Sequence, residues 1–236
     1  MTFRSKTFYF KLQGDYALWT APETKGGGER FTYSVPTRQA LHGIADSIYF
    51  KPTFKNVIEE VKVINEIHTE TKGIRALVGK GKADLNYVTY LSNPLYLVKY
   101  HFEWNEQRPD LEYDRNSRKH EAILERSLKK GGRRDIFLGT RECVGYIDFI
   151  TEEEYEETPS YYNGQTQSFG IMFHSFKYPI KSGEPLKSLF ANTVMEDGIV
   201  KFKSQKECEI VNTLSEYNFK YPKHIKSAED ELEDFE

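Results

Sequence analysis

Residues 96–104 (YLVKYHFEW) constrain the fold of this chain more than any other segment. Large apolar and aromatic side chains occupy every second position of this segment, and Lys99, His101 and Glu103 lie between them. Side chains that alternate in this way point to opposite faces of a β-strand. The segment therefore predicts a strand with one apolar face, which another layer of structure has to cover.

A helical segment precedes this strand. Apolar side chains recur at helical spacing through residues 40–48. Pro36 suits the first turn of such a helix, and Pro52 prevents the helix from continuing beyond residues 49–51. We therefore expect a helix that begins near Pro36 and ends at about Tyr49.

A second helical segment follows the strand. Asn116 or Ser117 can cap its first turn, and residues 122–128 supply its apolar side. Gly131-Gly132 is a typical helix stop. The sequence therefore predicts a second helix over roughly the span between these two signals.

The other strand candidates complete a repeating order. Residues 7–12 fit a first strand, and residues 135–139 (DIFLG) fit a short buried strand after the second helix. Residues 54–67 carry features of both a helical turn and a strand, and the glycines within residues 73–90 suggest an inserted hairpin. The resulting order is β-α-β-β-α-β, the split βαβ pattern of a ferredoxin-like fold.

The character of the sequence changes after Cys143. The acidic run at residues 151–157 (TEEEYEE) indicates a linker or a long loop. Alternating apolar residues at 169–173 and an apolar run at 199–202 predict strands. We therefore expect an α+β protein with a ferredoxin-like domain over residues 1–147, a small antiparallel β-rich domain over residues 148–226 and an acidic tail over residues 227–236.

The net charge of −3 conceals an uneven distribution. Residues 151–157 and 227–236 together hold eleven acidic residues and no basic ones, and without them 25 acidic residues face 33 basic ones. Residues 108–141 alone carry ten Lys or Arg against six Asp or Glu. A basic body with acidic appendages is expected if one face meets a polyanion, although a mixed surface with an acidic tail gives the same count.

Several classes of protein are excluded or disfavoured. No stretch of about 18 apolar residues exists to span a membrane, and residues 1–6 lack the apolar core of a signal peptide. Cys143 and Cys208 cannot form a CxxC-type zinc site, and they are read as free thiols of a cytoplasmic protein. No sequence pattern for a metal, nucleotide or dinucleotide site is present, so no metal and no cofactor are expected.

One corner of the expected fold gathers groups that can move protons. Lys119 and His120 fall in the first turn of the second helix, where free N–H groups and the helix dipole favour an anion and a neutral imidazole. In an antiparallel split βαβ sheet with strand order 4-1-3-2, the first helix ends at the edge where the second begins. Tyr49 therefore points to the same corner. Ordinary roles remain open for all three, as exposed cap residues and a packing tyrosine.

These three groups together suit the cleavage of RNA without a metal. In that reaction the ribose 2′-OH attacks its own phosphate, and the site must supply a base, an acid for the departing 5′-oxygen and a cation for the developing charge. No external water has to be activated. The corner at Tyr49, Lys119 and His120 is therefore a candidate site for RNA phosphodiester cleavage.

Long segments of the sequence resemble a known family. These segments are residues 14–20 (GDYALWT), 33–53 (YSVPTRQALHGIADSIYFKPT), 108–116 (RPDLEYDRN), 119–120 (KH) and 126–146 (RSLKKGGRRDIFLGTRECVGY). The chain is similar over nearly its whole length to the CRISPR-associated family-five proteins of subtype I-C (Dvulg variant), which belong to the repeat-associated (RAMP) superfamily. The acidic run at residues 151–157 is a departure from that family.

The resemblance implies a fold, an activity and site residues. Members have a ferredoxin-like N-terminal domain and a β-rich C-terminal domain. They cut CRISPR repeat RNA (pre-crRNA) without metal at the base of its hairpin, keep the crRNA 5′ handle bound and serve as a subunit of the surveillance complex. The catalytic tyrosine of an S-I-Y-aromatic-K-P segment corresponds to Tyr49, and the catalytic Lys-His pair corresponds to Lys119 and His120. The assignment of acid and base between Tyr49 and His120 stays open.

The basic residues around this corner are candidates for binding RNA, because cations bind the phosphate backbone. They are Lys25, Arg30, Arg108, Arg115, Arg118, Lys129, Lys130, Arg133, Arg134 and Arg141. Two alternatives to an endoribonuclease remain: a subunit that holds the crRNA handle without cutting it, and a subunit that binds duplex DNA. DNA lacks the 2′-OH, so this chemistry could not cut it.

Overall fold

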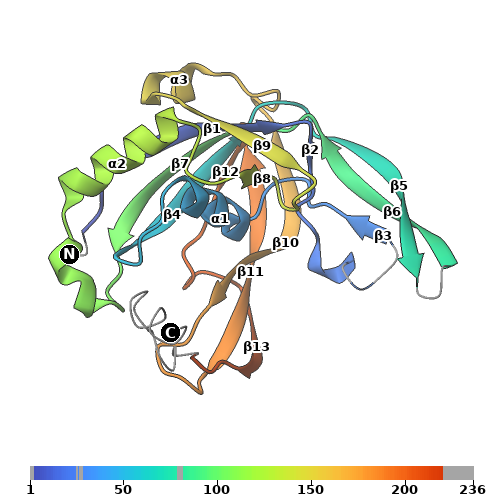
Figure 1. The fold of residues 1–236 in the computed structure, drawn as a ribbon. Coiled ribbons are helices and arrows are strands. Elements are labelled where there is room, and N and C mark those ends of the chain that lie inside the picture. Colours follow the sequence, from blue (N-terminus) through green and yellow to red (C-terminus); the bar gives the residue numbers. More distant parts are fainter. Residues whose placement is uncertain (1–2, 25, 27–28, 79–81, 220–236) are drawn as a thin grey trace, which may run out of the picture.

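The computed structural model describes residues 3–24, 26, 29–78 and 82–219 (Figure 1). The chain is an α+β protein, as the sequence predicts, and it is rich in antiparallel strands. The pairing of β3 (Glu29–Phe31) with β6 (Lys82–Ser92) is parallel. No helix in the described part of the chain is long and apolar enough to cross a membrane.

Four strands form the centre of the main sheet, and two helices cover one of its faces. The elements are β1 (Phe8–Gly14), α1 (Arg38–Ile48), β4 (Phe54–Val63), β7 (Leu95–Trp104), α2 (Ser117–Lys129) and β9 (Val144–Phe149). The strand order at this centre is β4-β7-β1-β9, and each neighbouring pair is antiparallel. Buried side chains of both helices belong to the same apolar core as those of the strands.

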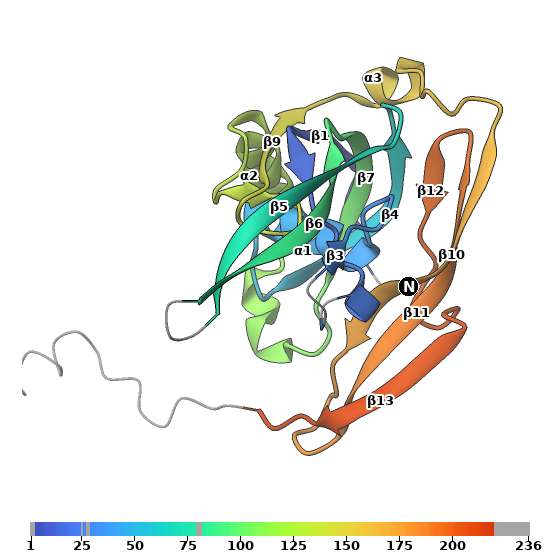
Figure 2. The same cartoon turned by 90° about the vertical axis from the view of Figure 1, so that its right-hand side faces the viewer.

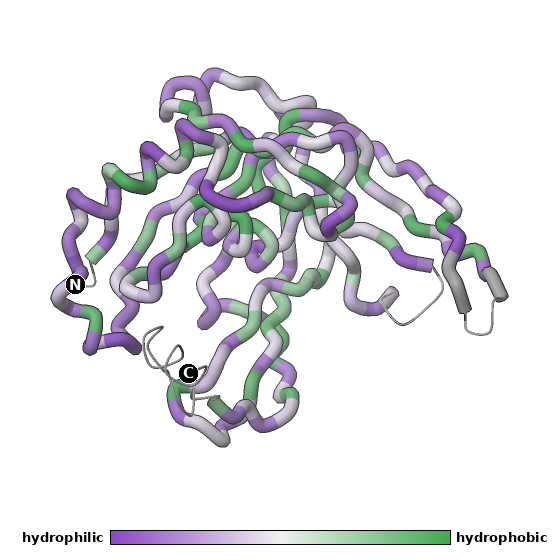
Figure 3. Tube along the Cα trace, viewed as in Figure 1, coloured by the Kyte–Doolittle hydropathy of each residue, from purple (hydrophilic) through white to green (hydrophobic). Residues whose placement is uncertain are grey.

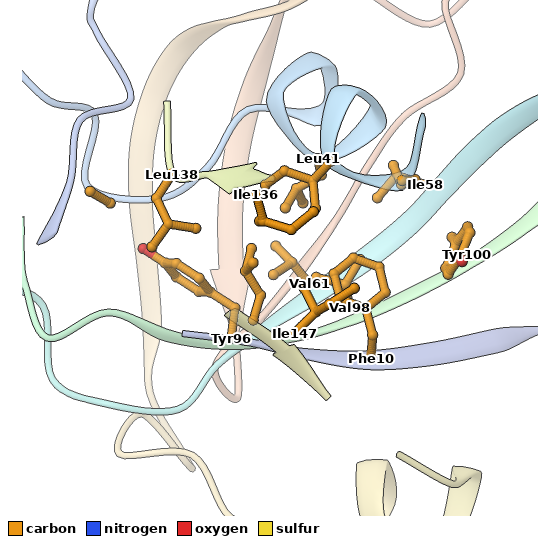
Figure 4. Close-up of a cluster of buried hydrophobic side chains, with 14 of the residues drawn as sticks. Phe10, Leu41, Ile58, Val61, Tyr96, Val98, Tyr100, Ile136, Leu138 and Ile147 are labelled. Atoms are coloured by element: carbon orange, nitrogen blue, oxygen red, sulfur yellow. The ribbon is translucent and has the colours of Figure 1, made fainter. Parts of the chain in front are cut away.

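The expected strand at residues 96–104 is confirmed as β7. Its alternate apolar side chains lie in the core, where Val98 has no exposed surface. Figure 4 shows Val98 beside Phe10 of β1, with Leu41 of α1 above the sheet. The apolar face that the sequence predicts is therefore covered by the two helices.

Residues 54–67, whose pattern fits both a helical turn and a strand, contain strand β4. This strand pairs with β7 on one side and with β12 (Ile199–Lys201) on the other. Hydrogen-bonded neighbours on both sides favour the extended conformation, and the local sequence does not reveal them.

The strand expected at residues 135–139 is only partly correct. Ile136–Phe137 form a short strand, β8, at the outer edge of the sheet, and the chain then turns back so that β9 pairs with β1. The Leu138 N–H donates to the Cys143 carbonyl across this turn, at 2.8 Å. β9 has a periodic pattern in which Val144 and Tyr146 are exposed, and it was not expected from the sequence.

The acidic run at residues 151–157 is a helix rather than the expected linker or loop. In α3 (Glu152–Glu157), the Thr151 hydroxyl accepts from the Glu154 N–H and the Glu154 carboxylate accepts from the Thr151 N–H, which is a capping box. Acidic side chains in a first turn favour a helix because that end is positive. Figure 3 shows α3 as hydrophilic, yet Tyr155 is buried beside Tyr9 on the sheet face opposite to α1 and α2.

The hairpin expected at residues 73–90 is present and longer than predicted. β5 (His68–Val78) pairs with β6 along its whole length. Together with β2 (Tyr16–Ala17) and β3, these strands form a second, four-stranded sheet. In Figure 1 this hairpin projects to one side of the molecule.

The C-terminal strands extend the main sheet. β11 (Pro185–Glu196) pairs with β10 (Thr166–Lys177), β12 and β13 (Ile210–Glu216). Because β12 also pairs with β4, they all belong to one nine-stranded sheet. Figure 2 shows these strands along one side of the molecule. The expected acidic tail at residues 227–236 lies outside the described residues.

Candidate active site

The two helices bring Tyr49 and His120 to one corner. α1 ends at Tyr49, whose backbone is extended and whose N–H donates to the Ala45 carbonyl. α2 begins after Asn116, whose side chain accepts a hydrogen bond from the Lys119 N–H, so the cap is Asn116 rather than Ser117. His120 follows in the first turn of α2. The end of the first helix and the start of the second therefore meet, as the expected topology requires.

Tyr49 and His120 are joined by a hydrogen bond. The Tyr49 Oη lies 2.9 Å from His120 Nδ1, and His120 Nε2 lies 2.8 Å from the backbone carbonyl oxygen of Asp114. A carbonyl oxygen only accepts, so Nε2 carries the proton that is donated to it. In a neutral imidazole Nδ1 is then the acceptor, and the Tyr49 hydroxyl donates to it. The two side chains are therefore joined by a hydrogen bond from the Tyr49 hydroxyl to His120 Nδ1.

Both rings are closed off from solvent. His120 has no exposed surface and Tyr49 is 1% exposed. The aromatic rings of Phe54 and Trp104 contact His120 with centroids 5.3 and 5.9 Å away. Burial raises the pKa of the Tyr49 hydroxyl, and the nearby charge of Arg133 opposes this shift. A phenol with a raised pKa binds its proton more tightly, and its phenolate form is a stronger base.

Lys119 is the solvent-facing member of the group. Its Nζ lies 2.5 Å from Asp114 Oδ1, and about half of its side chain is exposed. The hydrogen bond with Asp114 raises the pKa of Lys119, and it lowers the pKa of the Asp114 carboxyl. Lys119 is therefore a stable cation beside Tyr49 and His120.

Asp114 connects all of these groups, although it was not among the site residues expected from the sequence. It closes a short 3-10 helix, Pro109–Asp114. Its carbonyl fixes His120, while its carboxylate binds Lys119 and accepts a hydrogen bond from the Thr53 hydroxyl at 2.9 Å. The only sequence signal for this role is a carboxylate shortly before the Lys-His pair.

We expect Asp114→Asn to remove a pH-dependent part of the folding free energy. The pKa of Asp114 is lower in the folded chain than in the unfolded one, so its contribution is present above the unfolded value of about 4. That contribution is lost as the pH falls through the folded pKa. Urea unfolding of both proteins from pH 7 downwards measures it. The difference in stability should shrink on acidification, and a difference that is constant with pH contradicts the assignment.

Arg133 lies over the Tyr49 ring, with its Cζ 4.7 Å from the ring centroid. Its Nε donates to the Ser127 hydroxyl at 3.1 Å, and the backbone N–H groups of Arg133 and Arg134 face the Ser47 carbonyl. Gly131 and Gly132 have φ of +79° and +97°, which lets the chain turn back from α2 toward α1. Arg133 was expected only to bind RNA, and the structure places it against the tyrosine.

The other basic candidates are spread over several elements. Arg108 pairs with Asp110, Arg115 pairs with Glu106, and Lys129 pairs with Glu125. Arg118 is exposed in the first turn of α2, Lys130 is the C-cap of that helix, and Arg30 lies in β3. Arg141 lies near the Phe137 ring, and Lys25 lies outside the described residues. Only Arg133 among these ten contacts the ring of Tyr49 or His120 in the described part of the chain.

Comparisons with known proteins show that the chain is similar to CRISPR-associated proteins. Residues 7–203 match the family of CRISPR-associated proteins described as Cas5. A solved structure of a CRISPR-associated protein is 56% identical, with a TM-score of 0.80, and the match covers 90% of this chain and 100% of the other. A functionally uncharacterized protein from Streptococcus mutans is 60% identical, with a TM-score of 0.79 and the same coverage.

A curated relative carries a functional name. The protein of Mannheimia succiniciproducens named CRISPR pre-crRNA endoribonuclease Cas5d is 28% identical over 167 residues. The match covers 61% of this chain and 72% of that protein.

Proposed function

The chain belongs to the CRISPR-associated Cas5 family, and from this premise we propose that it is a metal-independent endoribonuclease that cuts CRISPR repeat RNA (pre-crRNA) by attack of a ribose 2′-OH. The name of the Mannheimia relative supports an RNA substrate of this class. The observation that carries the proposal is the hydrogen bond between Tyr49 and His120 beside the Lys119 cation.

The geometry suggests how the roles are divided. Because both nitrogens of His120 are engaged, Tyr49 is the group that meets the RNA. Its oxygen takes the proton of the 2′-OH while its own proton passes to His120 Nδ1. The 2′-oxygen then bonds to phosphorus, the bond to the 5′-oxygen breaks, and that oxygen takes a proton from solvent, while His120 returns its extra proton to solvent through the Tyr49 hydroxyl. Lys119 stabilises the charge of the phosphorane. The products are a 2′,3′-cyclic phosphate and a 5′-hydroxyl.

RNA has to open the corner before it can react, because both rings are buried. Arg133 covers the Tyr49 ring, and Asp114 holds Lys119. Charge-assisted hydrogen bonds to a phosphate diester are stronger than the contact of a guanidinium with a ring face. They are also stronger than an exposed ion pair, which contributes little. We propose that the scissile phosphate draws Arg133 and Lys119 to itself and thereby uncovers Tyr49.

We propose a ferredoxin-like arrangement for the RNA-processing domain at residues 1–147, which the strand order β4-β7-β1-β9 supports. We propose residues 148–226 as a β-rich C-terminal domain and residues 227–236 as an acidic tail. After cutting, the protein stays bound to the crRNA 5′ handle as a subunit of a type I-C surveillance complex. The free thiols of Cys143 and Cys208 support a cytoplasmic location.

A second candidate is a subunit that holds the crRNA handle, or duplex DNA, without cutting. The complete burial of Tyr49 and His120 favours it. An assay of the wild-type protein with the host's repeat RNA in excess EDTA separates the two. Cleavage within the repeat supports the endoribonuclease, and tight binding with intact RNA supports the alternative.

We expect Arg133→Ala with Arg134→Ala to weaken RNA binding and to flatten its salt dependence. Each lost phosphate contact should lower the slope of log K against log salt by about 1. Filter binding of uncleavable RNA over a range of salt concentrations measures this slope. Lys201→Ala, which removes an exposed charge on β12, is the control. If the double variant keeps the wild-type affinity and slope, these arginines do not lie on the RNA path.

A further inference from the structure

A cavity with a volume of about 800 Å³ lies on the C-terminal side of the molecule, between α1 with β4 and the end of β10 with residues 202–205. Ligand sites typically occupy about 300–1,000 Å³. Tyr49, Lys119 and His120 do not line this cavity. It is therefore a second place where a ligand of nucleotide size fits.

The cavity contains a cation that makes no ion pair with the described residues. Arg38 makes no ion pair and no side-chain hydrogen bond with the described residues. Burial lowers the pKa of its guanidinium, and the charge of Glu103 partly opposes this shift. The two carboxylates of the cavity wall are already engaged: Glu59 binds Arg4 and His101, and Glu103 lies 3.4 Å from His101. Arg38 is half-buried and its charge has no close partner, so this position favours an anion.

Asn56 offers a hydrogen-bond acceptor on the same wall. Its Nδ2 donates to Asp46 Oδ1 at 2.8 Å and to the Tyr49 carbonyl at 3.3 Å. Both partners are acceptors, which fixes the orientation of the amide. The side-chain oxygen of Asn56 is consequently left buried with no donor among the described residues. An N–H group of a ligand in the cavity would satisfy it.

The opposite wall supplies an aromatic ring and a second cation. Tyr178 is 53% exposed and follows β10 directly. Lys177, also exposed, has no ion pair with the described residues. A ring that can stack on a base next to cations that can bind phosphate is the combination by which proteins bind single-stranded nucleic acid.

We propose that this cavity binds one unpaired nucleotide of the RNA, apart from the scissile one. Arg38 and Lys177 bind its phosphate, Tyr178 stacks on its base, and the Asn56 side-chain oxygen accepts an N–H from that base. The inference rests on the proposed function in taking RNA as the ligand. Because Asn56 also holds the Tyr49 carbonyl, the bound nucleotide contacts the side chain that positions the end of α1.

The test uses the full-length protein and repeat RNA with a 2′-deoxy residue at the cut site, so that binding is measured without cleavage. 2-Aminopurine replaces each unpaired base next to the hairpin in turn. One position should be quenched by the wild-type protein and not by Tyr178→Ala. Arg38→Ala, Lys177→Ala and Tyr178→Ala should each weaken binding about fivefold or more, and the control Lys201→Ala should not.

Two results would overturn the proposal. One is an RNA affinity within about twofold of wild type for Lys177→Ala and Tyr178→Ala, which alter exposed side chains and leave the core intact. The other is that Arg38→Ala abolishes the binding of AMP but leaves the RNA affinity unchanged. That result would assign the cavity to a free nucleotide. If the wild-type protein binds all-ribose repeat RNA without cutting it, the endoribonuclease proposal fails, and these comparisons still decide the role of the cavity.

Discussion

Replacing His120 with alanine should abolish the cleavage of repeat RNA while leaving RNA affinity within a few-fold of wild type. The imidazole accepts the Tyr49 proton through Nδ1, and no other side chain in the described residues is hydrogen-bonded to the Tyr49 hydroxyl. Loss of a general acid–base group costs about 10²–10⁴ in rate. Single-turnover cleavage at saturating RNA measures the rate, and binding of 2′-deoxy RNA measures the affinity.

His68→Ala is the matched control, because His68 is exposed in β5 and lies outside the corner. Tyr49→Phe removes only the hydroxyl and should reproduce most of the loss. Since His120 is part of the buried core, thermal melting has to show that its variant is folded. A folded His120→Ala protein that cuts at more than about a tenth of the wild-type rate contradicts the proton path.

Lys119→Ala should lower the cleavage rate about 10²–10³-fold at saturating RNA. Its ammonium is the cation beside the Tyr49 hydroxyl, and its loss leaves the charge on the phosphorane oxygens uncompensated. Stability should change little, because the pair with Asp114 is exposed at the lysine end. Single-turnover cleavage measures the effect, with Lys201→Ala as the control for a lost positive charge.

Lys119→Arg should restore part of the rate, since a guanidinium supplies the same positive charge as the ammonium but differs from it in geometry. An alanine variant that binds RNA poorly but cuts at the wild-type rate once saturated would contradict the account. Lys119 would then be a binding residue only.

The candidate site could be predicted in large part from the sequence, because a helix-ending signal and a helix-capping signal fix the positions of its residues. Pro52 ends α1 close to Tyr49, and a cap at Asn116 places Lys119 and His120 in a first turn. The role of Asp114 in connecting His120 and Lys119 was not predicted, since it depends on a 3-10 turn that directs the Asp114 carbonyl toward His120. The stacking of Arg133 on Tyr49 likewise depends on the turn at Gly131-Gly132.

The fold was predictable where a long segment carries its own periodicity. β7 and the two long helices are of this kind, whereas the shorter periodic strand β9 was missed. β4 was ambiguous because its conformation depends on pairing with β7 and β12. α3 was missed because its only buried side chain, Tyr155, lies within a run of carboxylates that is typical of a loop. Its capping box stabilises the helix in spite of that composition.

The most direct test of the central claim is the chemistry of the cut. Repeat RNA and the same RNA with one 2′-deoxy residue at the cleavage position are incubated with the wild-type protein in excess EDTA, and the product ends are identified by mass spectrometry. We expect cleavage of the first RNA alone, with a 2′,3′-cyclic phosphate on the upstream product and a 5′-hydroxyl on the downstream one. Cleavage of the 2′-deoxy RNA, or a 3′-hydroxyl with a 5′-phosphate, would contradict it.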